Sequence, residues 1–125
     1  MAFTVANFDS SVLKYKLFED SDVNNVLRED ITQGVAGKLY GIDFDNNRGQ
    51  AAYLKITLTQ SGVAIGTTSP EIMFYVAATS GEARYWIPEG IAFTELSFWA
   101  VQLARDDSSA ALSGGSASKV RLITS

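Results

Sequence analysis

The acidic side chains at the ends of apolar runs are the residues of this sequence whose chemistry could support catalysis. Glycoside hydrolysis needs two carboxyl groups whose pKa values differ, one acting as acid and the other as base or nucleophile. The candidates are Asp43, Asp45, Glu71, Glu89 and Glu95. Each falls at the end of a predicted strand or in a turn, where carboxylates are ordinarily solvated, and no spacing pairs any two of them. We therefore expect a protein without catalytic residues.

The segment from Asp43 to Gly49 carries oxygen ligands at alternate positions, as a calcium loop does. The glycine that such a loop needs falls one place late, and Leu54 stands where the bidentate carboxylate belongs. A strand end followed by a turn rich in Asn and Asp is the simpler interpretation. The chain also has no Cys and no His, which excludes disulfides, the usual zinc ligands and imidazole-dependent triads. We expect no cofactor and no metal.

The net charge, the length of the apolar runs and the first residues indicate which classes of partner to expect. Fourteen acidic against ten basic side chains give a net charge of −4, which argues against binding to a phosphate backbone. No apolar run approaches the ~20 residues that span a bilayer. The first seven residues lack the basic start and apolar core of a signal peptide. We expect no nucleic acid partner, no membrane partner and assembly in the cytoplasm.

From residue 38 onward, short apolar runs alternate with clusters of Gly, Ser, Asn and Pro, which is typical of an all-β domain. In the first run, Tyr40, Ile42 and Phe44 are predicted to share the inward face. The run 72–78 is apolar on both faces, which predicts that it is covered on both sides. The predicted strands are 39–45, 52–59, 72–78, 83–87, 96–103 and 119–124, with a turn at 88–90. This spacing predicts a β-sandwich or jelly roll of about six to eight strands.

Two segments differ from this pattern. Residues 105–118 contain five Ser and two adjacent Gly, which predicts a long flexible loop within the sandwich domain of residues 38–125. Residues 1–37 are predicted to form an N-terminal arm that holds one strand, at about 12–18. In this arm a short helix is predicted over Asp22–Ile31, capped by Ser21, from the helical spacing of its apolar residues.

The apolar side chains of the arm, Phe3, Val5 and Phe8, allow two interpretations. They pack on their own domain, or they form an extended element that adds to a partner's sheet edge or groove. Among the aromatic residues, Trp99 is predicted to fill the core. By alternation, Arg84 and Trp86 face away from Tyr85, which predicts a surface shared with another copy of the chain, because Trp and Arg are favoured at interfaces. Tyr75 is a further candidate for this self-association.

An ordered set of short motifs resembles small virion proteins of tailed bacteriophages. The motifs are 38–46 (KLYGIDFDN), 52–56 (AYLKI), 63–70 (VAIGTTSP), 87–93 (IPEGIAF) and 96–101 (LSFWAV). They cover roughly half of the chain. In the family pattern a Gly usually precedes the Leu-Ser pair, whereas this chain has Glu95 there.

The resemblance implies a non-enzymatic capsid decoration or cement protein on the capsid surface of the virion, often trimeric, with the major capsid protein as its partner. The interpretation places Phe3, Val5 and Phe8 at the capsid and the Trp86 face in the trimer. The alternative is a tail-tip or carbohydrate-binding and receptor-binding β-sandwich module, in which Trp86 and Tyr85 stack on sugar.

Overall fold

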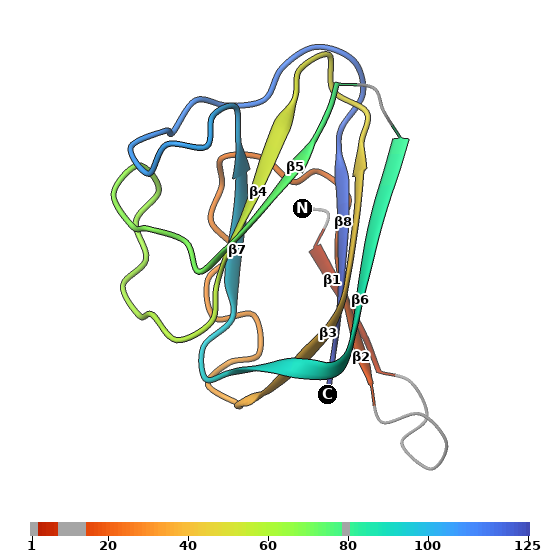
Figure 1. Cartoon of the computed structure of the whole chain (residues 1–125), viewed down its shortest axis with the longest axis vertical. Helices are drawn as coiled ribbons and strands as arrows, with labels where there is room; N and C mark the ends of the chain where they lie inside the picture. The colour runs from red at the N-terminus through yellow and green to blue at the C-terminus, as the bar shows by residue number, and fades with distance from the viewer. Residues whose placement is uncertain (1–2, 8–14, 79–80) are drawn as a thin grey trace.

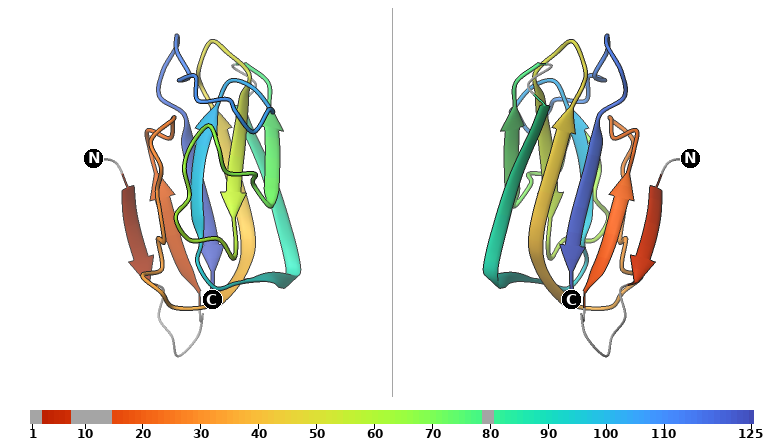
Figure 2. Two further views of the ribbon diagram at one scale, coloured as in Figure 1. Left: turned by 90° about the vertical axis from the view of Figure 1, so that its left-hand side faces the viewer. Right: turned by 90° about the vertical axis from the view of Figure 1, so that its right-hand side faces the viewer.

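Two antiparallel sheets face each other with the hydrophobic core between them (Figure 1). The computed structural model describes residues 3–7, 15–78 and 81–125. In spatial order the larger sheet contains β1 (Phe3–Asn7), β2 (Lys16–Asp20), β8 (Lys119–Thr124), β3 (Gly37–Asn46) and β6 (Gly81–Phe93). The smaller sheet contains β5 (Ile72–Val76), β4 (Ala52–Thr57) and β7 (Ser97–Val101). Figure 2 shows the five strands of the larger sheet side by side.

This architecture confirms the predicted all-β sandwich, while the jelly-roll variant stays a prediction. Alternation places one side of each strand in the core, since successive side chains point to opposite faces. Leu54 and Ile56 of β4 meet Phe44 of β3 and Leu122 of β8 there, and all four side chains are fully buried. In the part of the chain that the structure describes there is no helix, and so none that could cross a membrane.

The start of β3 departs from the predicted alternation, because the strand has a bulge between Leu39 and Gly41. The bulge turns Leu39 into the core, where it is fully buried, together with Ile42 and Phe44. Tyr40 moves to the outer face, where its ring contacts Trp86. The prediction that Tyr40 points inward is therefore wrong. One extra residue reverses every side chain before it, and nothing in the local pattern marks such a shift.

The partner strand β6 bends sharply opposite this bulge (Figure 1). Leu39 pairs with Ile91, and Gly41 pairs with Trp86, so residues 87–90 bulge out of the ladder. The turn predicted at 88–90 is thus a bend within one strand, and Pro88 stands where the ladder is interrupted. This bend carries β6 from one end of the larger sheet towards the smaller one.

Gly90 is predicted to be the least replaceable residue of the bend. Its φ is +72°, and an added Cβ would lie 2.8 Å from both Lys38 Cβ and Tyr40 Cε1. Gly90→Ala should therefore cost about 1–3 kcal/mol of stability through backbone strain and steric overlap. Urea unfolding of the purified variant measures this loss. Gly62 is the control, since its φ is also positive but nothing lies within 4 Å of an added Cβ. Equal losses at the two positions would contradict the steric part of the argument.

The outer face of the smaller sheet is only partly covered. Trp99 and Val101 of β7 pack under the 58–71 loop with Val63. Trp99 is 1% exposed, so it is buried as predicted, but in this second cluster and not in the core between the sheets. At the other edge, Met73 and Tyr75 of β5 are exposed. The prediction that the run 72–78 is covered on both sides is wrong, because β5 is an edge strand and the covering loop packs on β7.

Glu71 closes the 58–71 loop at its base. Its Oε1 accepts hydrogen bonds from the backbone N–H groups of Leu58 at 2.7 Å and Thr59 at 2.9 Å. Burial raises the pKa of the Glu71 carboxyl, but these hydrogen bonds outweigh burial and hold the pKa below its ordinary value of 4.5. The carboxylate therefore stabilises the fold above pH 4.5, and this stabilisation is lost as the pH falls through the lowered pKa.

Glu71→Gln should lower stability at pH 7 by less than about 1 kcal/mol, since the carboxylate is exposed and solvent screens it. At pH 3 the difference from the wild type should shrink, because the wild-type carboxyl then becomes neutral as well. Urea unfolding at the two pH values measures both differences. Glu89→Gln, at an exposed carboxyl on the bend of β6, should have no effect at either pH. A Glu71→Gln deficit that is larger at pH 3 would contradict the assignment.

Residues 21–36 follow the edge of β7 instead of forming the predicted helix. Arg28 and Phe98 exchange two backbone hydrogen bonds of 2.9 and 3.0 Å, and Ala100 N–H donates to the carbonyl of Asn24 at 2.9 Å. Val23 and Ile31 are both buried at the two ends of this segment. The helix prediction is wrong. This segment contains poor helix formers, and the edge of β7 provides hydrogen-bond partners for its backbone that replace those of a helix.

The region 1–37 is consequently part of the sandwich wherever the structure describes it. Strand β2 pairs with β8 and strand β1 pairs with β2, so both belong to the larger sheet. The strand predicted at about 12–18 is observed at 16–20, with residues 8–14 outside the described residues. The boundary at residue 37 between an arm and a sandwich domain stays a prediction.

Residues 105–118 form a loop without strands, as predicted, and the loop packs against the body of the protein. Leu112 and Ser118 are buried. Asn24 binds Leu112 twice, through its Nδ2 at 3.1 Å from the carbonyl and its Oδ1 at 2.7 Å from the amide nitrogen. Lys55 Nζ donates to the carbonyl of Arg105 at 2.6 Å. Flexibility of this loop stays a prediction.

Candidate functional site

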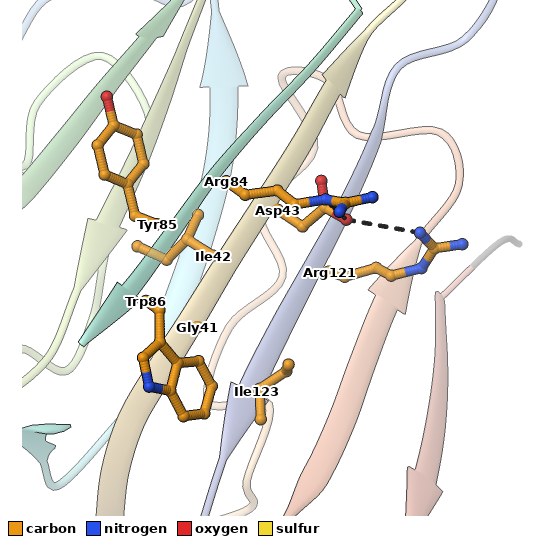
Figure 3. Close-up of a pocket in the computed structure, with 8 residues that line it drawn as sticks. All are labelled: Gly41, Ile42, Asp43, Arg84, Tyr85, Trp86, Arg121 and Ile123. Atoms are coloured by element: carbon orange, nitrogen blue, oxygen red, sulfur yellow. Dashed lines mark ion pairs between the residues drawn. The ribbon is translucent and has the colours of Figure 1, made fainter. Parts of the chain in front are cut away.

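A groove of about 340 Å³ lies on the outer face of the larger sheet, across β6, β3 and β8 (Figure 3). Its chemistry combines one exposed indole with two guanidinium groups and one carboxyl group. The lining residues are Gly41, Ile42, Asp43, Arg84, Tyr85, Trp86, Arg121 and Ile123. Because three neighbouring strands contribute, the groove exists only once the sheet has assembled.

The apolar half of the groove is built around Trp86, which is 54% exposed. Its ring lies over Gly41, since a Cβ added there would be 3.2 Å from Trp86 Cε3. Tyr40 and Tyr15 contact the same ring, with centroids 6.1 and 6.2 Å from that of Trp86. A glycine opposite the tryptophan and the bulge at Tyr40 thus create a continuous aromatic surface. We call Tyr15, Tyr40 and Trp86 the aromatic patch.

The polar half contains a charge network centred on Asp43. Arg84 Nε and Arg121 Nη1 each lie 3.6 Å from Asp43 Oδ2. Each arginine also makes a shorter ion pair of 2.6 Å, Arg84 with Glu82 and Arg121 with Glu19. Figure 3 shows the guanidinium groups of Arg84 and Arg121 near the Asp43 carboxyl, with the ion pair between Asp43 and Arg121 dashed. The network holds both arginines in place beside the aromatic patch.

Two carboxyl groups of this network titrate differently. Burial raises the pKa of Asp43, and the neighbouring Glu82 raises it further, against the opposing effect of Arg84 and Arg121. The contact with Asp43 and the charge of Arg84 lower the pKa of Glu82. Each of the two carboxyl groups thus shifts the pKa of the other, in opposite directions.

The other four acidic residues considered for catalysis are not among the residues that line this groove. Asp43 is the one of the five that lines it. Glu71 closes a loop of the smaller sheet, and Glu89 is exposed on the bend of β6. Across the described ranges, no group of three or more acidic side chains is arranged to hold a metal ion.

The structure brings together two of the three predicted self-association residues. Arg84 and Trp86 lie on the same outer face, as the alternation predicted, and both line the groove. Tyr75 lies on the smaller sheet, where its ring contacts Tyr53 at a centroid distance of 5.1 Å. Since the two sheets face opposite directions, a single flat contact cannot use both Trp86 and Tyr75.

The three predicted capsid-contact residues belong to β1 and the segment after it. Phe3 is partly buried, and its ring lies 6.0 Å from that of Phe18 and 6.3 Å from that of Phe98. Val5 pairs with Phe18 in the strand register. Phe8 lies outside the described residues. Of the two interpretations of this segment, packing on its own domain holds for Phe3.

The sequence analysis did not single out Tyr15, Tyr40, Arg121 or Ile123 as residues of this site. The closing strand did signal that Arg121 and Ile123 face outward, because Val120 and Leu122 alternate with them. What the sequence lacked was the pairing of β8 with β3, which places Arg121 opposite Asp43. Tyr40 lies on the outer face because of the bulge, which the alternation of the sequence does not reveal.

Comparisons with known proteins do not assign the chain to a family. No protein-family model, no curated protein and no solved structure matches it.

Proposed function

We propose that this chain is a non-enzymatic virion structural protein of the capsid decoration or cement type. In this proposal it binds the assembled major capsid lattice and associates with copies of itself as a trimer. The observation that carries the proposal is the aromatic patch, with Trp86 exposed, beside two arginines held in ion pairs on the outer face of the larger sheet. Trp, Tyr and Arg in such a surface are the residues that dominate protein interfaces. The ordered motifs that resemble those of phage virion proteins are the reason for assigning the chain to a virion in this proposal.

The physical effect of such a protein is mass action. A protein that binds the assembled lattice but not dissociated subunits stabilises the lattice by RT ln(1 + [L]/Kd) at each site. Association into a trimer links three weak contacts, so that modest affinity at one site becomes tight attachment overall. No bond is made or broken in this role.

Stoichiometry on intact particles tests the proposal. Quantitative mass spectrometry of purified virions should find this chain in hundreds of copies, comparable to the major capsid protein. Particles stripped of the chain should rupture at lower temperature, and adding the purified protein back should restore their resistance. A handful of copies per virion would place the chain in the tail and contradict the proposal.

Trp86→Ala is predicted to abolish self-association. Removing the indole deletes the largest exposed ring of the patch, and loss of an aromatic hot spot costs an interface about 2–4 kcal/mol. Sedimentation velocity should show a trimer for the wild type and a monomer for the variant, with both thermal unfolding midpoints measured as a check on folding. Tyr75→Ala is the matched control, because Tyr75 is 57% exposed but lies on the other sheet. Dissociation by Tyr75→Ala alone would place the contact on the smaller sheet.

A carbohydrate-binding or receptor-binding module of the tail tip is the second candidate. The observation that favours it is the exposed indole of Trp86 next to the carboxyl of Asp43 and the guanidinium of Arg84 in one groove. A sugar ring stacks on an indole while its hydroxyl groups bind such polar groups. Glycan-array binding by the wild type that is lost in Trp86→Ala would support this candidate over capsid decoration.

A further inference from the structure

Strand β1 lies at one edge of the larger sheet. Among the described residues, β1 is the last strand of the larger sheet and pairs with β2 alone. Figure 2 shows it at the outer margin of the sheet. Its sequence, Phe-Thr-Val-Ala-Asn, contains neither a charged residue nor a proline. Charges, prolines and bulges are the usual means by which proteins prevent pairing at an edge, and β1 uses none of them.

The edges of β7 and β6 differ from that of β1. The segment 24–31 of the chain itself covers the edge of β7. At the far edge of the larger sheet, β6 carries Glu82, Arg84 and Pro88 and bends out of the ladder. There the two sheets are also joined by a ring contact between Phe74 and Tyr85 at a centroid distance of 4.0 Å. On the β1 side the sandwich opens instead.

A groove of about 330 Å³ marks this opening, between β1 and the segment 27–33. Phe3, Leu27 and Ile31 supply its apolar walls, and Phe3 is the residue of the edge strand itself. An extended chain that pairs with β1 would thus have apolar contacts beside its backbone hydrogen bonds. Backbone pairing with alternate side chains in a neighbouring groove is the mode called β-strand addition.

The charge at the rim of the groove is negative. Arg28 is engaged by Asp20 in a buried ion pair of 2.6 Å. Glu29 and Asp30 accept backbone hydrogen bonds from Val63 and Gly34, at 3.2 and 2.8 Å. No ion pair involves either of these two carboxylates in the described part of the chain. A basic side chain is the complement of this rim.

We infer that the edge of β1 and the adjoining groove bind an extended segment of the capsid partner that carries apolar residues next to a Lys or Arg. The segment adds to the larger sheet as a further strand. Its apolar side chains contact Phe3, Leu27 and Ile31, and its basic residue lies at Glu29 and Asp30. This inference rests on the proposed function for the identity of the partner, and it reverses the predicted direction of the contact: the N-terminal strand accepts a partner strand instead of extending to one.

Hydrogen–deuterium exchange of the full chain, free and bound to stripped capsids, tests the inference. Exchange in the peptide that covers residues 3–7 should slow at least about tenfold on binding, because the edge amides become paired. The peptide that covers residues 83–87, at the opposite edge of the same sheet, is the internal reference and should not change. Binding to capsids without protection of β1 overturns the inference and leaves the proposed function standing. Failure to bind capsids at all overturns both.

Charge at the rim is tested separately with Glu29→Gln, which keeps the oxygen that accepts the Val63 amide and removes the negative charge. The variant should bind stripped capsids about twofold to fivefold more weakly at low salt, with an unchanged thermal midpoint. Glu89→Gln, at an exposed carboxyl on the bend of β6, is the matched control and should bind like the wild type. Equal weakening by both variants would show an effect of net charge alone and would overturn the assignment of the rim.

Discussion

Asn46→Ala should destabilise this protein by about 3–5 kcal/mol and lower its thermal midpoint by about 10–20 °C. Asn46 is fully buried at the end of β3. Its Nδ2 donates to the carbonyl oxygens of Gln50 at 2.9 Å, Val76 at 3.1 Å and Ala77 at 3.1 Å. The first carbonyl belongs to the turn that follows β3, and the other two lie at the end of β5 in the opposite sheet. One side chain therefore joins the two layers.

The Oδ1 atom of Asn46 completes the joint. It accepts hydrogen bonds from Ser118 Oγ at 2.7 Å and from the Arg48 amide at 3.1 Å. Ser118 is itself fully buried. Alanine at position 46 would leave polar groups without partners in a site where water does not replace them, and each such group costs about 1–3 kcal/mol.

Asn47→Ala is the control for this prediction. Asn47 is the next residue in the turn and is exposed, and its side chain makes one long contact of 3.5 Å with the carbonyl of Ala117. We expect a change within about 0.5 kcal/mol. Guanidinium unfolding of both variants measures the difference. A loss below about 1 kcal/mol for Asn46→Ala would show that water reaches the joint and that the hydrogen bonds are replaced.

The second large effect is expected from Arg28→Met, with a loss of about 3–5 kcal/mol. Arg28 Nε lies 2.6 Å from Asp20 Oδ2, and the Asp20 side chain is 1% exposed. Asp20 ends β2 of the larger sheet, while Arg28 pairs with β7 of the smaller one. Removing the guanidinium leaves a carboxylate that is buried without a counterion. Most of the loss comes from this unpaired charge, since the pair itself contributes little beyond its own desolvation.

The double variant Asp20→Asn/Arg28→Met separates these two contributions. Removing both charges should recover more than half of the loss, because no buried charge is left unpaired. Arg105→Met is the matched control: Arg105 pairs with Asp107 at the same 2.6 Å, but both side chains are more than 60% exposed. It should cost less than about 0.5 kcal/mol. Equal losses for Arg28→Met and Arg105→Met would contradict the role given to burial.

The exposed arginines of the groove differ from Arg28 in this respect. Arg84 is 70% exposed and pairs with Glu82 on its own strand. Its ion pair contributes little to stability. Arg84 belongs to the outer face of the larger sheet, where self-association is proposed.

Local patterns in the sequence determined the fold class and most of the strands. In the predicted closing strand, Val120 and Leu122 alternate with Arg121, and both apolar residues are buried. The outward placement of Arg84 and Trp86 followed from the same rule. Alternation is reliable in these cases because the direction of a side chain along a strand depends only on its neighbours in sequence.

Only the tertiary structure decided how these strands lie next to one another. Glu19 and Arg121 are separated by 102 positions, and their ion pair exists because β2 pairs with β8. The bulge at Tyr40 and the path of residues 21–36 along β7 likewise depend on hydrogen-bond partners that lie far away in the chain. A backbone group must be paired when it is buried, but the sequence near it does not specify which distant edge supplies the partner. The groove, the aromatic patch and the open edge of β1 are therefore consequences of strand pairing.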